Sequence, residues 1–296
     1  FHFSSDEYTF VRIDKYFKAP LFKKDAISPD FIKQGELGDC YLVSSLCRVA
    51  KQPELIRDLF DTATPDLILG PVQDSINIEC GAVVIYFYVF GRPTPVLIDT
   101  LIPFFRGKRI PRFVRPSQLT ASPWHCLVEK AFAKLIGTYS DLDGGLFEDA
   151  IYRLFGYFPN NTDLSVLMKP ENSNKMSPFD RMMKYQRQGA VMSASFKNEG
   201  TVTKEQALEM GIVENHAYVI QKVRKVGDLE FLCLRNPWGD HEWLGDWSDT
   251  SPLWTPEIKA ELDFKPSNDG TFWICYKDFA KYFTSIGISR PITDGY

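Results

Sequence analysis

The stretch Gln34–Tyr41, which reads Gln-Gly-Glu-Leu-Gly-Asp-Cys-Tyr, leads from a glycine-bearing turn directly into a helical pattern. Apolar residues follow at the spacing of one helix face: Leu42, Val43, Leu46, Val49 and Ala50. Asp39 stands at the expected N-cap, so we expect Cys40 to begin the helix. The start of a helix is partly positive and has unpaired N–H groups, which favour a thiolate and can stabilise an oxyanion. Gln34 can fold its amide back beside them. A buried cysteine on a core helix explains this segment equally well.

A thiolate nucleophile needs an imidazole partner and a group that orients the imidazole. His216 opens an apolar strand pattern directly after a loop, which is typical of a catalytic histidine and also of a surface histidine with satisfied hydrogen bonds. Asn236 ends a second strand pattern, and pairing of the two strands would bring its amide to His216. An asparagine fixes the ring without taking its proton, although a turn-forming role before Pro237 is the alternative. We expect His125 to pack in a core and His241 to lie in a turn.

The remaining pattern predicts an α+β fold with a helix-rich half, residues 1–150, and a β-rich half, residues 151–296, on either side of a cleft. Residues 1–39 are expected to be arms and loops, 91–95 a turn, and most of 196–211 a polar loop. The helices and strands are expected as follows: helices over 40–50, 127–136, 147–155, 178–188 and 277–283, and strands over 76–90, 96–102, 190–195, 216–224, 229–235 and 271–276.

Composition excludes several classes of protein. The 296 residues are 44% hydrophobic, and 34 basic residues against 38 acidic residues give a net charge of −4, which argues against nucleic acid as a partner. No apolar run approaches the length of a membrane span. The six cysteines form no CxxC pair and the histidines are scattered, which disfavours zinc and disulfide scaffolds and favours a reducing compartment. The start at Phe1, without Met or a secretory segment, suggests a fragment of a longer chain.

Several motifs occur in one order along the chain. Residues 34–40 are followed by 127–134 (Leu-Val-Glu-Lys-Ala-Phe-Ala-Lys), Gly144-Gly145, 214–218 (Glu-Asn-His-Ala-Tyr), 235–239 (Arg-Asn-Pro-Trp-Gly), 243–249 and 269–273. Together they resemble the catalytic core of the calpains, from about residue 30 to about residue 285.

The resemblance implies a two-lobed papain-like cysteine protease core, with a helical lobe that carries Cys40 and an antiparallel β-rich lobe that carries His216 and Asn236. It also implies a calcium-activated, cytoplasmic endopeptidase that cuts protein substrates at limited sites and that has flanking regulatory domains. Gln34 would supply an oxyanion donor, and Trp238 would shield the His–Asn pair. The chain departs from the family at Tyr41, where Trp is usual, and at Asn215, where Gly is usual, so its substrate preference is open.

The resemblance also implies calcium ligands. In the β-rich lobe the matching acids are Glu242, Asp249 and Asp269, whereas Thr271 stands where a further acid is expected. In the helical lobe Glu129 matches, but Phe31 replaces an acid, with Asp30 beside it. Since each lost carboxylate weakens a calcium site, we expect calcium to bind the β-rich lobe better. Acids on a solvated surface are the alternative for each position.

Two other classes of function compete with an active endopeptidase. One is a calpain-like binding or regulatory module without turnover, although such relatives usually lose the Cys or the His. The other is a Cys-His acyltransferase of the transglutaminase kind, where Asp rather than Asn would be expected as the orienting group. A calpain-fold protease that needs no metal is a further alternative.

Overall fold

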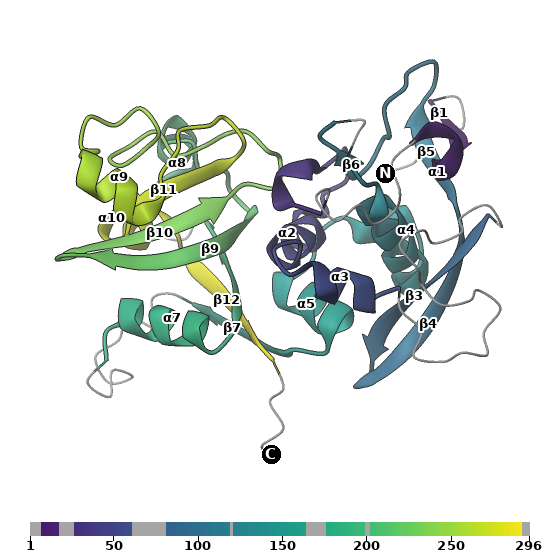
Figure 1. Ribbon diagram of the computed structural model, residues 1–296, viewed down its shortest axis with the longest axis horizontal. Helices are drawn as coiled ribbons and strands as arrows, with labels where there is room; N and C mark the ends of the chain where they lie inside the picture. Colours follow the sequence, from purple (N-terminus) through teal and green to yellow (C-terminus); the bar gives the residue numbers. More distant parts are fainter. Residues whose placement is uncertain are drawn as a thin grey trace. The chain divides into compact units, whose positions relative to one another are not determined.

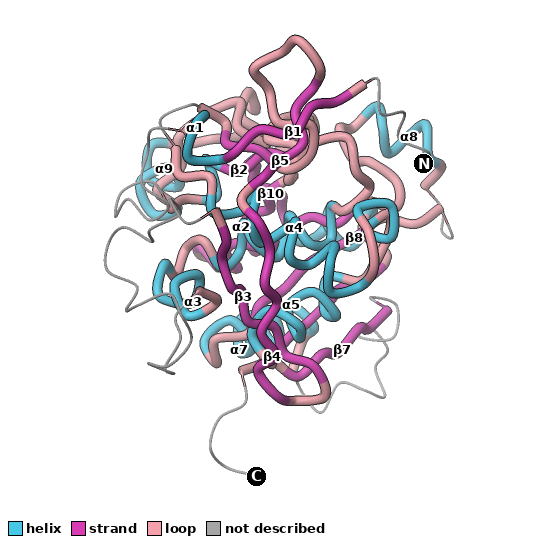
Figure 2. Tube along the Cα trace, turned by 90° about the vertical axis from the view of Figure 1, so that its right-hand side faces the viewer, coloured by secondary structure: helices cyan, strands magenta, loops and turns pink. Residues whose placement is uncertain are grey.

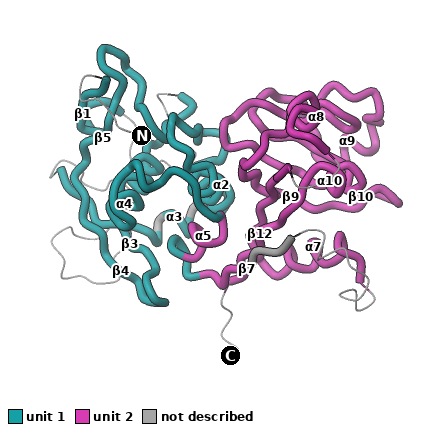
Figure 3. Tube along the Cα trace, turned by 180° about the vertical axis from the view of Figure 1, so that it is seen from behind, with its two compact units in different colours: residues 1–146, 153–156 teal, residues 147–152, 157–296 magenta. Residues whose placement is uncertain are grey.

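The computed structural model describes residues 7–17, 27–60, 81–118, 121–163, 176–198 and 202–291 (Figure 1). The chain forms two compact units (Figure 3). Unit 1 comprises Phe1–Leu146 and Arg153–Gly156, and unit 2 comprises Phe147–Tyr152 and Tyr157–Tyr296. The division falls within one helix, α5 (Phe147–Phe155). Helices and antiparallel sheets together make the fold α+β.

Unit 1 is built on two apolar helices, α2 (Cys40–Val49) and α4 (Trp124–Ile136). Three two-stranded antiparallel sheets accompany them, β1–β5, β2–β6 and β3–β4 (Figure 2). Phe132 of α4 packs edge-on against Phe87 of β3, with ring centres 5.6 Å apart. The other elements are β1 (Tyr8–Arg12), α1 (Ile13–Tyr16), η1 (Pro29–Phe31), β2 (Ile32–Lys33), α3 (Pro53–Asp58), β3 (Ala82–Val89), β4 (Arg92–Asp99), β5 (Leu101–Phe105), β6 (Arg115–Pro116) and η3 (Tyr139–Leu142).

Unit 2 is built on a six-stranded antiparallel sheet in the order β11-β10-β9-β8-β12-β7. Its elements are β7 (Phe158–Asp163), α7 (Pro178–Arg187), β8 (Val191–Ser195), α8 (Lys204–Glu209), β9 (Ala217–Val226), β10 (Leu229–Arg235), α9 (Pro256–Leu262), β11 (Thr271–Cys275), α10 (Tyr276–Tyr282) and β12 (Ser285–Arg290).

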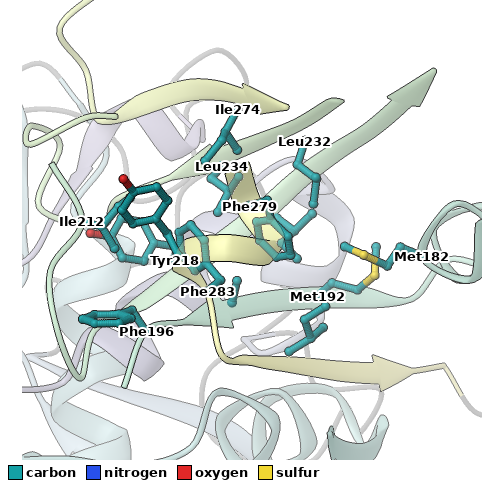
Figure 4. Packing of buried hydrophobic residues seen from close by; sticks show 14 of the residues in the cluster. Met182, Met192, Phe196, Ile212, Tyr218, Leu232, Leu234, Ile274, Phe279 and Phe283 are labelled. Atoms are coloured by element: carbon teal, nitrogen blue, oxygen red, sulfur yellow. The ribbon is translucent and has the colours of Figure 1, made fainter. Parts of the chain in front are cut away.

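The side chains of β10 alternate between two apolar clusters, because successive residues of a strand point to opposite faces of the sheet. Leu232 and Leu234 pack into the larger cluster with Tyr218 and Phe279 (Figure 4). Phe231 and Cys233 pack into a second cluster that contains Trp247, Trp254 and Trp273. Both faces of β10 are therefore buried from Phe231 to Arg235, so this end of the strand is a well-packed support for Asn236.

The helices expected from periodicity at 40–50, 127–136, 147–155, 178–188 and 277–283 are confirmed, with ends shifted by a few residues. The expected turn over 91–95 is wrong. A two-residue turn at Phe90 and Gly91, both with positive φ (49° and 74°), joins β3 to β4, and such turns match the twist of the strands they connect. Pro93 and Pro95 therefore lie within β4, which pairs only with β3 among the described strands, and an edge strand tolerates proline.

Two loop predictions also need correction. The described part of residues 1–39 contains β1, α1 and β2 rather than arms and loops alone. The predicted polar loop before residue 211 contains α8, whose first turn is closed by a capping box between Thr203 and Gln206. Residues 76–80 of a predicted strand lie outside the described residues. Within the described part of the chain, no helix is both long and apolar enough to cross a bilayer.

Candidate active site

Cys40 is the first residue of α2, as the sequence predicts, and its side chain is partly exposed. The carbonyl of Asp39 accepts the N–H groups of Leu42 and Val43, at 2.9 and 3.0 Å, which closes the first turn of the helix. Gln34 is buried, and its Nε2 donates to the carbonyl of Leu37 at 2.7 Å. This hydrogen bond folds the amide of Gln34 back over the loop that ends at Cys40.

The loop before Cys40 packs between two other segments of unit 1, one at residues 112–113 and one at residues 143–144. A Cβ on Gly35 would overlap the carbonyl oxygens of Arg112 and Phe113. On Gly38 it would overlap the carboxylate of Asp143, and the carbonyl of Gly38 accepts the N–H of Gly144 at 2.9 Å. At Gly35 the close approach of another backbone requires a residue without a side chain, whereas at Gly38 the Asp143 side chain would have to move.

Asp39 occupies the N-cap position, but its side chain makes no capping hydrogen bond. It is fully buried and interacts with the buried carboxyl of Glu129 on α4. Burial, with a smaller contribution from Asp143, raises the pKa of Asp39 to about 7. Burial and the neighbouring Asp39 raise the pKa of Glu129 well above its usual value. Two adjacent buried carboxyls are most stable when a proton lies between them, so this pair is protonated near neutral pH.

His216 and Asn236 meet at the ends of the paired strands β9 and β10, as expected from the sequence. Nε2 of His216 lies 2.7 Å from Oδ1 of Asn236, and both side chains are buried. Arg235 pairs with Val219, and a register shift between Cys233 and Leu234 precedes this pair. The backbone N–H of Asn236 donates to the carbonyl of Gly270 at 2.7 Å, which fixes the end of β10.

The orientation of the Asn236 amide follows from its other two hydrogen bonds. Its Oδ1 accepts the N–H of Trp238 at 3.1 Å, and its Nδ2 donates to the carbonyl of His241 at 3.0 Å. Because Oδ1 can only accept, Nε2 of a neutral His216 must carry the proton. Nδ1 then keeps a lone pair, which is the form that a general base needs.

The surroundings of His216 favour the neutral imidazole. Burial lowers the pKa of His216 to about 4; the hydrogen bond with Asn236 opposes this shift, and His241 adds to it. The ring of Trp238 lies 4.5 Å from that of His216, and Tyr218 packs edge-on at 5.1 Å. These rings cover the imidazole and keep water from its hydrogen bond with Asn236.

His241 has a role that sequence reasoning missed. It has a positive φ of 55°, and its carbonyl is the acceptor that orients Asn236. Its ring packs edge-on against Trp238 at 5.4 Å and is held by Asp240, whose carboxylate lies 2.7 Å from Nδ1. No sequence signal could have identified this residue, because its contact with Asn236 is made by the backbone.

The three acids predicted as calcium ligands in unit 2 each accept backbone N–H groups. Glu242 accepts those of Asp269 and Gly270, at 2.9 and 2.7 Å, and Asp249 accepts that of Ser267 at 2.7 Å. Asp269 accepts the N–H of Thr271 at 2.8 Å and lies 3.5 Å from Arg235.

Burial first, and then neighbouring carboxylates, raise the pKa of Glu242 and of Asp249. The three acids therefore lie close enough to repel one another. In the described part of the chain, however, no three Asp, Glu, His or Cys side chains converge closely enough to hold a metal ion. The three carboxylates therefore do not meet at one point in this conformation.

The predicted ligand in unit 1 fits calcium less well. Oε1 of Glu129 accepts the N–H of Val114 at 2.8 Å, and the carboxyl faces Asp39 rather than an open ligand position. Phe31 lies in η1, and the carboxylate of Asp30 interacts with the hydroxyl of Ser28 at 3.0 Å.

The other cysteines and histidines differ from Cys40 and His216. The five described cysteines, Cys40, Cys47, Cys126, Cys233 and Cys275, form no disulfide, and Cys80 lies outside the described residues. Cys47, Cys126 and Cys233 are buried, whereas Cys275 is partly exposed. His125 is fully buried as predicted, and burial lowers its pKa to about 3.

The predicted catalytic residues are divided between the two units. Cys40 and Gln34 belong to unit 1, and His216 and Asn236 belong to unit 2. Unit 2 therefore holds an oriented imidazole. Unit 1 holds a cysteine at a helix start and, in the loop before it, the buried amide of Gln34.

Comparison with known proteins identifies the family of the chain. The family described as calpain family cysteine protease matches residues 3–290. The chain is 31% identical over 293 residues to mouse Calpain-5, covering 94% of this chain and 45% of that protein. It is 33% identical over 272 residues to the Calpain-type cysteine protease DEK1 of Arabidopsis thaliana, covering 91% of this chain and 12% of that protein.

A Calpain of Schistosoma mansoni is 32% identical over 267 residues, covering 87% of this chain and 33% of that protein. The chain thus spans less than half the length of these relatives. Because the family matches almost the whole sequence, this chain belongs to the calpain family of cysteine proteases.

Proposed function

We propose that this chain is the catalytic core of an active cysteine endopeptidase that cuts protein substrates at limited sites by a Cys-His-Asn mechanism. The observation that carries the proposal is the hydrogen bond of 2.7 Å between His216 and Asn236, with the amide held in one orientation by Trp238 and His241. A histidine that serves only in packing does not need its tautomer selected in this way.

In the proposed reaction the two units form a papain-like cleft that brings Cys40 to Nδ1 of His216. His216 takes the thiol proton, and the thiolate attacks the carbonyl carbon of the scissile peptide bond. The backbone N–H of Cys40 and the amide of Gln34 donate to the developing oxyanion. The imidazolium then protonates the leaving amine, and His216 deprotonates a water that hydrolyses the thioester.

The pKa of His216 supports the first of these steps. With a pKa of about 4, the imidazole is a neutral base at physiological pH. A thiolate placed beside it would raise this pKa, because an adjacent negative charge favours the imidazolium. Asn236 cannot accept the proton, so the ion pair is not discharged through it.

The decisive test is the substitution Cys40→Ser, with Cys47→Ser as the matched control on the same helix. Cys40→Ser should keep the fold and abolish peptide release from a denatured protein, because a serine hydroxyl beside this imidazole stays protonated. Cys47→Ser should be nearly silent for activity. Full activity in Cys40→Ser would refute the proposal.

Iodoacetamide labelling separates the enzyme from the non-catalytic module. Labelling of Cys40 should be fast and should slow in His216→Ala, whereas a module would label equally slowly in both. Incorporation of amines instead of peptide release would indicate the transglutaminase-type alternative.

We also propose that calcium activates the enzyme through the β-rich unit, where Glu242, Asp249 and Asp269 lie near one another and a cation would relieve their repulsion. The complete ligand set would require these side chains to move. A metal-independent calpain-fold protease is the alternative, and activity in excess chelator against millimolar calcium distinguishes the two.

A reducing, cytoplasmic location and flanking regulatory domains complete the proposal. The five described cysteines are not cross-linked, and the chain spans less than half of its relatives.

A further inference from the structure

A charged cluster in unit 1 contacts the loop that leads to Cys40. Arg112 lies between two carboxylates, with Nε 2.7 Å from Glu36 and a terminal nitrogen 3.0 Å from Glu7. Its side chain is 9% exposed, whereas those of Glu7 and Glu36 are 57% and 45% exposed. A buried guanidinium needs such partners, because an unpaired buried charge is strongly destabilising.

The guanidinium is held in place from several directions. It lies 5.9 Å from the ring centre of Tyr8 and 5.8 Å from that of Phe105. The two carboxylates keep the pKa of Arg112 above its usual value although burial opposes this. The side chain is therefore a permanent cation that can hold two anions at once through its fork of N–H groups.

Each carboxylate belongs to a different part of unit 1. Glu7 directly precedes β1, which pairs with β5, and the carbonyl of Glu7 accepts the N–H of Arg106 at 3.0 Å (Figure 2). Glu36 lies inside the loop between Gln34 and Cys40, and its N–H donates to the carbonyl of Arg112 at 3.3 Å. The cluster thus connects the start of β1 to the loop that carries the nucleophile.

Two further hydrogen bonds also hold the loop in place. Gly144 donates to Gly38 at 2.9 Å, and Gln34 donates to Leu37 at 2.7 Å. Without the ion pair to Arg112, the loop would keep the contacts of Gly38 and Gly144 but would lose its side-chain anchor at Glu36. The segment most affected would be residues 34–37, which include the amide expected to stabilise the oxyanion.

We propose that Arg112 is a positioning residue of the protease, which holds the loop of Gln34–Cys40 in its reactive geometry by bridging Glu36 to Glu7. The proposal deepens the proposed function and rests on it, because the loop matters for turnover only if Cys40 is the nucleophile. Glu7 and Glu36 are positioning residues in the same sense and touch no substrate.

The test uses the charge-neutral variants Glu7→Gln and Glu36→Gln, whose half-exposed positions tolerate an amide of the same shape. Asp99→Asn is the matched control. Asp99 forms an ion pair of 2.7 Å with Lys130 in the same unit, with side-chain exposures of 52% and 15%, and it accepts the N–H of Leu101, so these partners lie outside the loop. The whole chain is used throughout.

Two readouts separate positioning from general stability. Hydrogen exchange of the peptide covering residues 34–42 should become about tenfold faster in Glu7→Gln and Glu36→Gln and stay unchanged in Asp99→Asn. With a peptide substrate, kcat should fall about tenfold in Glu36→Gln while KM changes little, because a misplaced catalytic group costs rate rather than binding.

The effects of Glu7→Gln and Glu36→Gln on kcat should also be non-additive. Once Glu36 is neutral, loss of Glu7 should lower kcat little further, since both act through Arg112. Arg112→Lys, which keeps the charge but lacks the fork, should behave like a single carboxylate variant.

The exchange measurement needs no turnover, so it keeps the two proposals distinguishable. A wild-type chain without activity would refute the proposed function, while faster exchange in both carboxylate variants would still support the bridge. Unchanged exchange over residues 34–42 in both variants, or an equal change in Asp99→Asn, would overturn the bridge even in a fully active enzyme.

Discussion

At the scale of single residues, the candidate site depends on hydrogen bonds that leave each group one orientation. Asn236 uses both ends of its amide, so the tautomer of His216 follows without any freedom. This arrangement is typical of a general base whose ring is held in one orientation. In the proposed mechanism the roles of the two residues therefore differ: His216 moves a proton, and Asn236 only holds the imidazole in place.

Asn236→Ala should therefore slow turnover by about 10²-fold, the lower end of what a positioned general acid–base contributes. Cys40 and His216 can still form a poorly oriented pair, so a residual rate should survive in steady-state assays. A loss as complete as that of Cys40→Ser would contradict a purely orienting role.

Gly145 offers a second test at this scale, this time of packing. A Cβ there would lie 2.5 to 2.7 Å from ring carbons of Tyr41. Gly145→Ala should lower the free energy of unfolding by about 1–3 kcal/mol, the usual cost of overpacking. Denaturant unfolding of Gly145→Ala with and without Tyr41→Ala measures the coupling; purely additive effects would show that Tyr41 does not cause the strain.

At the scale of elements, α2 and α4 in unit 1 meet at a protonated carboxyl pair, and β9 and β10 in unit 2 present the His–Asn pair. Asp39 directly precedes Cys40, so protonation of the Asp39–Glu129 pair affects the stability of the helix that begins with the proposed nucleophile. Since the raised pKa values favour the protonated form in the folded state, the pair stabilises the fold most at low pH.

Asp39→Asn tests this pH dependence. The pKa of Asp39 is raised from 3.8 to about 7, so its stabilising contribution is complete below pH 3.8 and is lost as pH rises through 7. Relative to Asp39→Asn, the wild type should lose at most about 4 kcal/mol between pH 4 and pH 8. Urea unfolding of both proteins across this range measures the difference, and parallel stability curves would contradict the carboxyl pair.

At the scale of the whole molecule, the chain divides into two units, and each holds part of the proposed catalytic residues and part of the expected calcium ligands. In unit 2, Glu242, Asp249 and Asp269 repel one another, whereas Glu129 in unit 1 is engaged with Asp39 and Val114. The negative charge is therefore denser around the three acids of unit 2 than around Glu129 in unit 1. This density would favour a cation in unit 2.

We expect calorimetry to show that Asp249→Ala clearly lowers the affinity for calcium and that Glu129→Gln hardly changes it. The second substitution is conservative because Glu129 is buried and protonated. A lone carboxylate with a few carbonyls should bind only at or beyond millimolar calcium. The reverse order of effects, or no binding by the wild type at millimolar calcium, would exclude this site and favour the metal-independent protease.

Much of the fold follows from local pattern. Helical periodicity predicts α2 with Cys40 as its first residue, and short apolar runs predict β9 and β10, because both depend on residues close together in the sequence. The motifs around Cys40, His216 and Asn236, in that order along the chain, also indicate the family. What the sequence by itself determined is therefore the class of fold, the family and the identity of the candidate catalytic residues.

Only the tertiary structure decided how these residues are held. Gly35 is required by the carbonyls of residues 112–113, and Asn236 is oriented by the carbonyl of His241. Asp39 faces Glu129 instead of capping its helix. Contacts of this kind join segments far apart in the sequence or use the backbone, which every residue shares. No local pattern records them, because burial and close approach exist only once the chain is folded.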